Sequence, residues 1–303
     1  MGILFFRKNT SLLKPANLSI NIEQIFRFLI NKVLILGVIV MAMLSSAVYA
    51  INGDFNGDGC SDNASVSGTR IIITRGCNKG TQTHYFSGQQ IINGAYELNG
   101  QPGLEIGVIE SGRLVIIDDR INTTRNYFFS GGWIINGVYE LDGQAGNEMG
   151  VIESGRLVIL HDRNATKKYY FFNAGWQING IYNTDGVAGA EMGIVQGGKF
   201  TILRDRNGTQ KDYFITGAYS ILGTADTDGD PGDEVGINAG EYFYIIDDRE
   251  RYKRNYRLGS NYSFTSYGEF NNLPGLDLRF QRLVSGRVLT GTIFDNPGYI
   301  DWD

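Results

Sequence analysis

After residue 50, hydrophobic residues occur in short runs, many of them alternating with polar residues. Examples are "WIINGVYEL", "EMGVIES", "RLVIL" and "KKYYFF", and glycine, asparagine, aspartate and serine separate them. Runs of this length, rich in β-branched and aromatic residues and bounded by turn-forming residues, are typical of β-strands. None of them has the 3.6-residue period of an amphipathic helix. The pattern therefore predicts an all-β protein.

The same pattern returns every 43 residues. The segment "INGAYELNGQPGLEIGVIESGRLVIIDDR" begins at Ile92, and close copies begin at Ile135, Ile178 and Ile221. Weaker copies follow at "FTSYGEFNNLPGLDLRF" and precede at "DFNGDGCSD", which brings the number of units to six. Self-similarity at a fixed period indicates one supersecondary unit per repeat.

Each unit has room for four short strands, which is the content of a propeller blade. A single four-stranded sheet cannot bury both of its faces, so the units must stack on one another. We therefore predict an all-β fold, namely a six-bladed β-propeller built from six 43-residue four-stranded repeats. An open β-solenoid is the alternative.

The first 50 residues differ from the rest. Three basic residues between Lys14 and Lys32 precede the uncharged run "VLILGVIVMAMLSSAVYA", which ends in small residues. This order is typical of a secretory signal peptide. A signal anchor is the alternative, because the run is nearly long enough to span a membrane. We predict a signal segment over residues 1–50 and one propeller domain over 51–303 that is secreted, periplasmic or held at the cell surface.

The exported part is acidic, with 22 Lys and Arg residues against 31 Asp and Glu residues. An acidic surface repels phosphate backbones, which argues against a nucleic-acid partner.

The two cysteines of the exported part flank a stretch whose pattern predicts strand, turn and strand, with the turn near Ser67 to Thr69. In such a hairpin Cys60 and Cys77 face each other, so we predict a disulfide between them. Two separate buried thiols are the alternative.

The fixed register allows the six loops equivalent to "DFNGDGCSD" to be compared position by position. The first and third positions always hold Asp, Glu or Asn, the ninth is always acidic, and the fifth has lost its oxygen donor in two repeats. Because the ninth acid persists where the fifth donor is missing, we expect it to accept hydrogen bonds from backbone N–H groups of the loop.

Two of the six loops hold the full set with an acid at the fifth position. They hold Asp54, Asn56, Asp58 and Asp62 in the first unit, and Asp226, Asp228, Asp230 and Glu234 in the fifth. Clustered carboxylates repel one another without a cation, and calcium takes six to eight oxygen ligands. We therefore predict calcium as the cofactor of both loops, with weaker candidates in the second and third units. The alternative is an Asx-rich turn that binds no metal.

The first loop resembles the calcium-binding hairpin loops of FG-GAP (VCBS-type, integrin-α-like) repeats, which read Asp-x-Asp/Asn-x-Asp-Gly-x-x-Asp before an apolar strand. The fifth loop, "DTDGDPGDE", departs from that pattern at Pro231 and Glu234. The resemblance implies a propeller with calcium in loops between neighbouring strands, bound in the first loop by the four residues named above. The units are shorter than integrin blades and have no Gly-Ala-Pro triplet, so an adhesion role is not implied.

Other residues also recur in step with the repeat. Aromatic residues expected to pack between sheets are Tyr127, Phe128, Phe129, Tyr170, Phe171, Phe172, Tyr213 and Phe214. The Asp119–Arg120 pair and its three equivalents are expected to stabilise turns through partly exposed ion pairs. Trp133 and Trp176 are expected to be core residues, with sugar stacking as the alternative.

Repetition favours binding over catalysis, because an active site needs unique residues at one place. The exported part has two histidines and neither a Gly-x-Ser-x-Gly nor a His-Glu-x-x-His motif. We predict a secreted, monomeric, calcium-binding β-propeller that acts as a protein- or glycan-binding module and is not an enzyme. The alternatives are an extracellular polysaccharide hydrolase using paired carboxylates and a structural role at the cell envelope.

Overall fold

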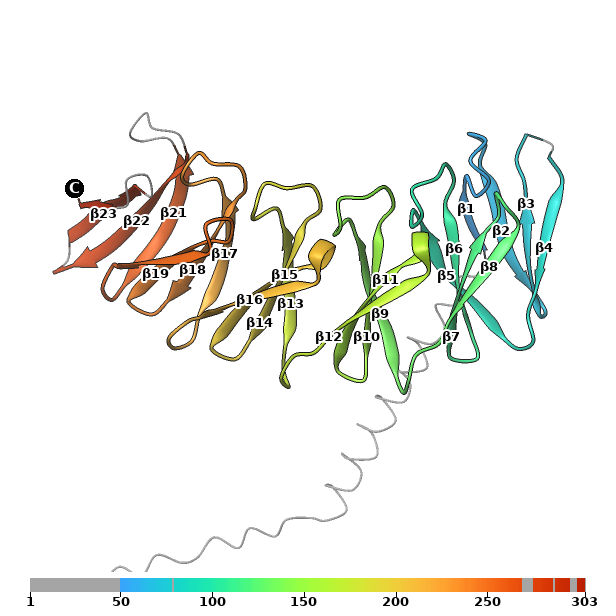
Figure 1. The fold of residues 1–303 in the computed structure, drawn as a ribbon. Helices are drawn as coiled ribbons and strands as arrows, with labels where there is room; N and C mark the ends of the chain where they lie inside the picture. Colours follow the sequence, from blue (N-terminus) through green and yellow to red (C-terminus); the bar gives the residue numbers. More distant parts are fainter. Residues whose placement is uncertain (1–49, 78, 269–274, 286, 295–298, 303) are drawn as a thin grey trace, which may run out of the picture. The chain divides into compact units, whose positions relative to one another are not determined.

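The computed structural model describes residues 50–302 except 78, 269–274, 286 and 295–298 (Figure 1). The predicted signal segment, apart from its last residue, lies outside the described residues. All described elements belong to the unit Val48–Asp303. In this part of the chain, no helix has both the length and the apolar character that crossing a membrane requires.

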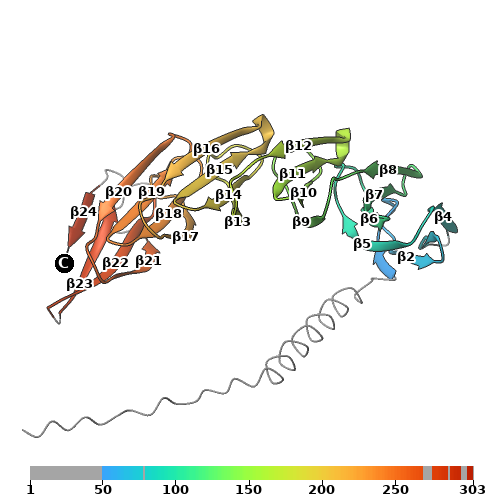
Figure 2. The same cartoon turned by 90° about the horizontal axis from the view of Figure 1, so that it is seen from below.

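The described chain forms six four-stranded sheets (Figures 1 and 2), here called blades 1 to 6. Blade 1 contains β1 (Ala50–Gly53), β2 (Asp62–Ser67), β3 (Arg70–Thr74) and β4 (Thr81–Tyr85). Blade 2 contains β5 (Gln90–Tyr96), β6 (Glu105–Glu110), β7 (Arg113–Asp118) and β8 (Thr123–Tyr127). Blade 3 contains β9 (Trp133–Tyr139), β10 (Glu148–Glu153), β11 (Arg156–His161), the 3-10 turn η1 (Asp162–Asn164) and β12 (Thr166–Tyr170).

Blade 4 contains β13 (Gln177–Tyr182), β14 (Glu191–Gln196), β15 (Lys199–Arg204), the 3-10 turn η2 (Asp205–Asn207) and β16 (Thr209–Phe214). Blade 5 contains β17 (Ser220–Ala225), β18 (Glu234–Ala239), β19 (Tyr242–Asp247) and β20 (Tyr252–Arg257). Blade 6 contains β21 (Tyr262–Gly268), β22 (Asp277–Val284), β23 (Arg287–Phe294) and β24 (Tyr299–Trp302). Every blade is an antiparallel meander whose strands pair in chain order.

The chain is built from six propeller-type blades. Its second strands begin at the ninth loop position of every repeat, so the 43-residue period is the period of the blades. The hydrophobic core lies between consecutive blades, because each apolar cluster joins one blade to the next. In β6, for example, Ile106, Gly107 and Val108 are buried in succession, which explains why the second strands are continuous apolar runs.

The motif Ile-Asn-Gly-x-Tyr of blades 2 to 4 has a structural reason. In blade 2 the pairing of β5 with β6 shifts between Ile92 and Gly94, so Asn93 is the extra residue of a β-bulge. The Tyr96 ring lies over two glycines, because a Cβ on Gly94 would meet its hydroxyl at 2.6 Å and one on Gly107 its ring at 2.7 Å. The glycines therefore make room for the ring immediately before the loop.

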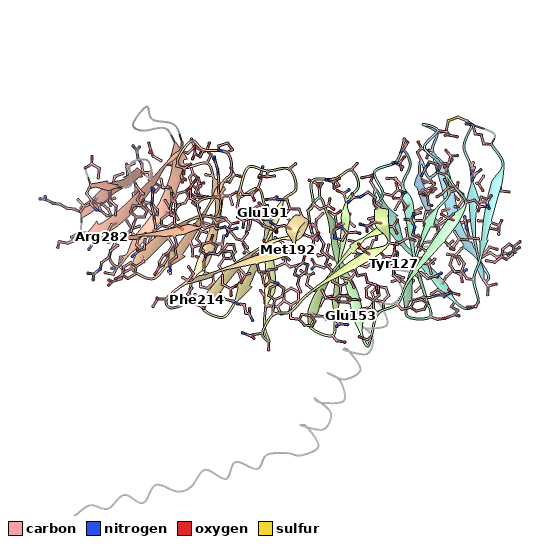
Figure 3. All side chains as sticks on the ribbon, in the orientation of Figure 1. Tyr127, Glu153, Glu191, Met192, Phe214 and Arg282 are labelled. Atoms are coloured by element: carbon pink, nitrogen blue, oxygen red, sulfur yellow. A yellow bond between two sulfur atoms is a disulfide. The ribbon has the colours of Figure 1, made fainter. Side chains whose placement is uncertain are left out.

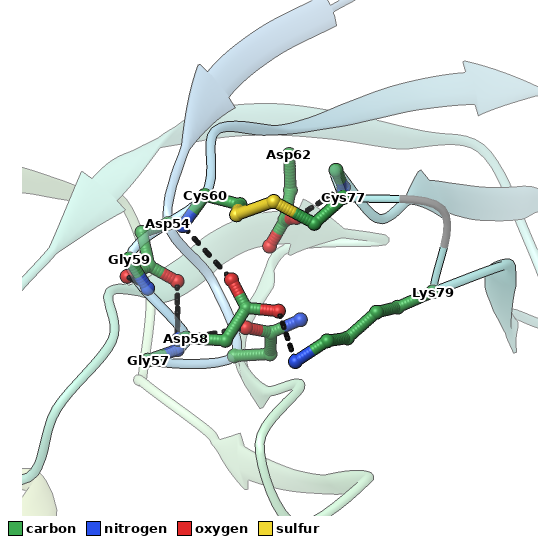
Figure 4. Close-up of a disulfide and its surroundings, with 10 residues drawn as sticks. Asp54, Gly57, Asp58, Gly59, Cys60, Asp62, Cys77 and Lys79 are labelled. Atoms are coloured by element: carbon green, nitrogen blue, oxygen red, sulfur yellow. Dashed lines mark hydrogen bonds and ion pairs between the residues drawn. A yellow bond between two sulfur atoms is a disulfide. The ribbon is translucent and has the colours of Figure 1, made fainter.

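The disulfide predicted in blade 1 is confirmed. Cys60 and Cys77 are bonded, with 6.1 Å between their Cα atoms (Figure 4). Strands β2 and β3 pair in the expected register, with Asn63 opposite Thr74. The cysteines lie just beyond the ends of these strands rather than inside the ladder, so the bond ties the loop before β2 to the segment after β3.

The expectation that the recurring aromatic residues pack between sheets is confirmed for only some of them. Tyr127 and its equivalents Tyr170 and Tyr213 are each 4% exposed. The following residues, Phe128, Phe171 and Phe214, are 65–69% exposed, so their prediction as core was wrong. Of these, Phe214 is labelled in Figure 3. Neighbouring residues of a strand point to opposite faces, and on the fourth strand only one face is covered.

Candidate metal centre

The ninth loop position supports the backbone of the loop before each second strand. Its carboxylate accepts a hydrogen bond from the N–H of the second loop residue in every loop for which the structure gives this contact, at 2.6–2.9 Å. The pairs are Asp62 with Phe55, Glu105 with Leu98, Glu148 with Leu141, Glu191 with Thr184, and Glu234 with Thr227. The sequence prediction for this acid is confirmed. Its presence by itself therefore indicates a loop conformation rather than a metal.

Loops of neighbouring blades are also joined to each other. The N–H of Leu104 donates to the carbonyl of Asp54 at 2.8 Å, and the N–H of Leu276 donates to the carbonyl of Asp226 at 2.7 Å. Gly57 lies so close to the next loop that a Cβ there would be 2.4 Å from the carbonyl oxygen of Pro102. The loops thus stand side by side along one end of consecutive blades, held by backbone contacts.

In the first loop, Asp54 turns both of its oxygens toward the backbone (Figure 4). Oδ1 accepts from the N–H groups of Gly57 at 2.7 Å and Asp58 at 3.1 Å, and Oδ2 accepts from Gly59 at 2.7 Å. Asn56 Oδ1 accepts from the N–H of Asp58 at 3.0 Å. These are the bonds of a tight Asx turn.

The other two acids of the first loop are engaged in the same way. Asp58 Oδ1 accepts from the N–H of Cys60 at 2.8 Å, and Oδ2 lies 3.1 Å from Lys79 Nζ. Asp62 accepts from Gly76 with the oxygen that does not bind Phe55, also at 2.8 Å. The four predicted ligands are therefore close in sequence, yet their oxygens point to separate donors.

The fifth loop has a different arrangement. Oxygens of Asp226, Asp228 and Glu234 lie within 4.8 Å of one another. Asp226 Oδ1 accepts from the N–H of Gly229 at 2.6 Å, and Asp228 Oδ1 accepts from the N–H of Asp230 at 3.0 Å. Each of these two acids thus uses one oxygen to shape the loop.

Asp230, the fourth predicted ligand of this loop, is not part of that group. Its side chain is 60% exposed, and its Oδ2 lies 3.5 Å from Arg249 Nη1. The residue contributes its backbone N–H to Asp228. Three of the four predicted ligands of the fifth loop therefore converge, and the fourth points toward solvent.

Asp247, at the end of β19, was missed by the sequence analysis. It is 1% exposed, and its Oδ1 accepts from the N–H of Glu250 at 2.8 Å. Its Oδ2 has no hydrogen-bond partner within 3.5 Å among the described residues, although the Tyr252 hydroxyl is close enough to lower the pKa of Asp247. Buried oxygens without a partner are rare in folded proteins. The repeat register could have identified this position, which precedes the recurring Asp–Arg pair.

Burial, together with the charges of Asp228 and Asp247, raises the pKa of Glu234 to about 8, against the lowering effect of the hydrogen bonds from Thr227. Burial is also the largest cause of the raised pKa of Asp247, to which Asp228 adds. The charges of these acids thus oppose one another's ionisation. A bound cation would remove that repulsion.

In blade 3 a histidine stands at the position of Asp247. Its Nδ1 lies 3.3 Å from Asp142 and 3.5 Å from Glu148, and its Nε2 lies 2.8 Å from Asp205 in the next blade. Burial opposes its charge, but hydrogen bonds to Asp205 and Glu148 raise the pKa of His161 to about 9. His161 is therefore a cation among three carboxylates. Its positive charge offsets the negative charges of these carboxylates, which would otherwise be candidates for binding a metal ion.

In blade 4 the same position holds an arginine. Arg204 is 6% exposed and its Nε donates to Asp185 at 3.0 Å. Its Nη2 lies 2.5 Å from Asp248 in the next blade. Asp185, at the third loop position, and Arg204, at the end of the third strand, thus form a buried ion pair.

The recurring Asp–Arg pairs are not the turn-stabilising, partly exposed ion pairs that the sequence suggested. Their aspartates are 0–1% exposed. Asp162, for example, accepts from the hydroxyl of Tyr127 at 2.5 Å and from Arg125 Nη1 at 2.6 Å, both in the preceding blade. The aspartate is buried because it joins two blades, which no local pattern of turn residues reveals.

Two cavities lie at equivalent places between first strands of consecutive blades. The larger, of about 450 Å³ between blades 2 and 3, is lined by Asn93, Ile109, Gly112, Trp133, Ile134 and Ile135. The other, of about 290 Å³ between blades 4 and 5, has Asn179 and Tyr219 at the places of Asn93 and Trp133.

The two tryptophans singled out in the sequence are half-buried. Trp133 packs on Phe129 with 4.9 Å between ring centroids, and Trp176 packs on Phe172 at 5.1 Å. The Trp133 indole N–H donates to the carbonyl of Gly112 at 2.7 Å. One part of the Trp133 ring is thus core, as expected, and another lines the larger cavity.

No family model and no curated protein matches the chain. Similar solved structures include an Agrocybe aegerita lectin described as recognising non-reducing terminal N-acetylglucosamine, at 9% identity over 84% of this chain and 79% of that one, with a TM-score of 0.39. The WD40 domain of SCAP from fission yeast is 13% identical over 76% of this chain and 59% of that one, with a TM-score of 0.32. BBS1N in complex with ARL6DN is 12% identical over 82% and 78%, with a TM-score of 0.31. No function is assigned to the chain from likenesses at this level.

Proposed function

We propose that the protein is an exported, calcium-stabilised β-propeller that binds an extracellular glycan and has no catalytic activity. The observation that carries the proposal is the recurrence of one cavity type between blades 2 and 3 and between blades 4 and 5. Each cavity combines an aromatic ring, from Trp133 or Tyr219, with an asparagine amide and aliphatic side chains. An apolar surface with a few polar groups suits the alternating C–H and hydroxyl faces of a sugar ring.

The asparagines at these cavities have a defined orientation. Asn93 Oδ1 accepts from the hydroxyl of Tyr96, and Asn179 Oδ1 accepts from the hydroxyl of Tyr182. This contact turns the amide N–H groups, which are donors only, away from the tyrosine. A hydroxyl of a bound sugar is a suitable acceptor for them. Two sites of modest size on one chain would give avidity for a branched or repeating glycan.

Export and calcium binding complete the proposal. The Cys60–Cys77 disulfide suits an oxidising compartment. An all-oxygen set from Asp226, Asp228 and Glu234 suits a hard cation such as calcium. The first-loop calcium site stays a prediction, and its support is weaker because backbone N–H groups and Lys79 already engage the oxygens of its acids.

Glycan binding is tested with the full chain on an array of immobilised glycans, followed by titration of any bound glycan in solution. We expect Asn93→Ala and Trp133→Ala to weaken binding at the larger cavity by about tenfold, while Phe128→Ala, which removes an exposed ring outside the cavity, leaves it unchanged. Asn93 is exposed, so its substitution leaves the core intact. Equal loss in all three variants, or a blank array, would contradict the proposal.

A protein partner is the second candidate, and a separate observation favours it. Tyr85, Phe128, Phe171 and Phe214 are 65–77% exposed at equivalent ends of the fourth strands. Exposed aromatic rings are common at protein interfaces. For a protein partner we expect replacement of Phe128, Phe171 and Phe214 together by serine to abolish binding and Asn93→Ala to have no effect. The opposite pattern identifies the glycan.

Calcium binding is tested by thermal unfolding of the chelator-treated full chain with and without millimolar calcium. A ligand that binds only the folded state stabilises it, by about 2.7 kcal/mol at a hundred times its dissociation constant. We therefore expect the unfolding temperature to rise with calcium. An unchanged unfolding temperature would remove calcium from the proposed function and leave the glycan sites untouched.

A further inference from the structure

In blades 1 to 5, one residue at or just after the end of the third strand stands at the same position of the repeat. We call this place the third-strand position, and its residues are Arg75, Asp118, His161, Arg204 and Asp247. In blade 3 its side chain reaches the acids at the third and ninth loop positions, and in blade 4 it reaches the acid at the third. In these two blades the loop and the third strand thus share one buried polar site.

Three blades fill that site with a basic side chain of the protein itself. His161 lies among Asp142, Glu148 and Asp205, and Arg204 binds Asp185. The third, Arg75 of blade 1, binds an acid of the next blade at 2.8 Å and also feels the charges of two loop acids. The loop acids of these blades therefore have a cation built into the chain.

In blade 2 a side-chain amide, rather than a basic side chain, binds the buried acids. Its third-strand position is an acid, Asp118, and its third loop position is Asn99 rather than an aspartate. The Asn99 amide donates to Glu105 at 2.5 Å and to Asp118 at 3.0 Å. One side chain thus supplies N–H groups to both buried carboxylates.

At these two positions blade 5 has neither a basic side chain nor an amide. Its third-strand position is Asp247, and its third loop position is Asp228, so two acids stand where the other blades have at least one donor. Oxygens of Asp226, Asp228 and Glu234 already lie within 4.8 Å of one another. Asp247 is 1% exposed and keeps its Oδ2 without a hydrogen-bond partner among the described residues. Asp247 is outside this group of three, but it stands at the register position of His161, whose Nδ1 lies 3.5 Å from the ninth loop acid Glu148.

We propose that calcium occupies in blade 5 the place that basic side chains occupy in blades 3 and 4, and that Asp247 is one of its ligands. The other protein ligands are Asp226, Asp228 and Glu234, whereas Asp230 is not a ligand. The inference rests on the calcium binding of the proposed function, but it names a ligand outside the loop and excludes one inside it. The loop pattern alone would choose Asp230 instead.

The first test is calorimetric titration of calcium into the chelator-treated full chain and two variants. We expect Asp247→Asn to weaken calcium binding at least tenfold, since it removes a charge and keeps the oxygen that binds the Glu250 N–H. The matched control is Asp230→Asn, which removes the same charge in the same blade at a side chain that is 60% exposed. We expect this control to change the affinity less than twofold.

The second test places in blade 5 the arginine that blade 4 has at the equivalent position, Arg204. In Asp247→Arg the guanidinium is expected to pair with Asp228, as Arg204 pairs with Asp185. The unfolding temperature of this variant should no longer respond to calcium and should be at least that of the chelator-treated parent chain. A retained calcium response would overturn the inference. Should this variant fail to fold, the titration of the two asparagine variants still decides.

The outcomes separate the inference from the proposed function. Calcium binding that Asp247→Asn leaves unchanged, or that Asp230→Asn abolishes, overturns the inference and leaves a calcium-stabilised propeller. Absence of any calcium heat in the parent chain overturns the inference and removes calcium from the proposed function, whose glycan sites are tested separately. Binding lost in Asp247→Asn and kept in Asp230→Asn supports both.

Discussion

The hydroxyl of Tyr127, at the end of β8, donates a hydrogen bond of 2.5 Å to Oδ1 of Asp162 in the next blade. The same bond recurs between Tyr170 and Asp205 and between Tyr213 and Asp248, at 2.6 Å each. In all three pairs both residues are buried. The fourth strand of one blade is thus fastened to the end of the third strand of the next by a repeated contact between a phenol and a carboxylate.

This contact predicts the effect of Tyr127→Phe. The change removes a buried hydrogen bond to a charged group, so we expect the free energy of unfolding in urea to fall by about 2 kcal/mol. Tyr169→Phe is the control, since Tyr169 lies on a fourth strand beside a buried tyrosine but is 44% exposed. An equal loss in both variants would mean that the bond between the blades contributes nothing.

His161 predicts a dependence of stability on pH. Its pKa is raised from 6.5 to about 9 by its carboxylate partners Asp205 and Glu148, against the effect of burial. A raised pKa in the folded state means that His161 contributes its full stabilisation below pH 6.5 and loses it as the pH rises through 9. Unfolding temperatures measured from pH 6 to pH 10 should therefore fall more steeply for the parent chain than for His161→Gln. Parallel curves would show that His161 is not charged in the folded protein.

Most of the architecture could be predicted from the sequence because the same contacts recur in successive 43-residue repeats. The period set the strand register, and the register placed Cys60 opposite Cys77 and gave the ninth loop acid its backbone partner. These features depend on residues close together in one blade. Local patterns were sufficient for them.

The candidate metal centre was only partly readable. The loops of blades 1 and 5 look alike in sequence, yet Asp54 binds three backbone N–H groups with both oxygens, whereas oxygens of Asp226, Asp228 and Glu234 lie within 4.8 Å of one another. What distinguishes the blades is the third-strand position, Arg75 in one and Asp247 in the other. That residue lies outside the loop pattern, so a comparison restricted to the loop could not weigh it.

The disulfide predicts a loss of stability on its removal. Cys60 and Cys77 are 17 residues apart in sequence, and a cross-link over such a loop contributes about 3 kcal/mol. We expect the double variant Cys60→Ala, Cys77→Ala to lower the free energy of unfolding by that amount in urea. Adding reductant to the parent chain should give the same shift and leave the double variant unaffected. A reductant effect on the double variant would point to another cause.

The glycine under the Tyr96 ring predicts a steric effect. A Cβ on Gly107 would lie 2.7 Å from Tyr96 Cε2, which is closer than two carbon atoms can approach, so the ring must move from its place beside the loop of blade 2. We expect Gly107→Ala to lower the free energy of unfolding by about 2 kcal/mol, as overpacking does elsewhere. Gly132→Ala is the control, because a Cβ there meets nothing within 4 Å. If both variants unfold at the same urea concentration, the Tyr96 ring can move without a loss of stability. Room for the ring would then not explain the glycines beside Tyr96.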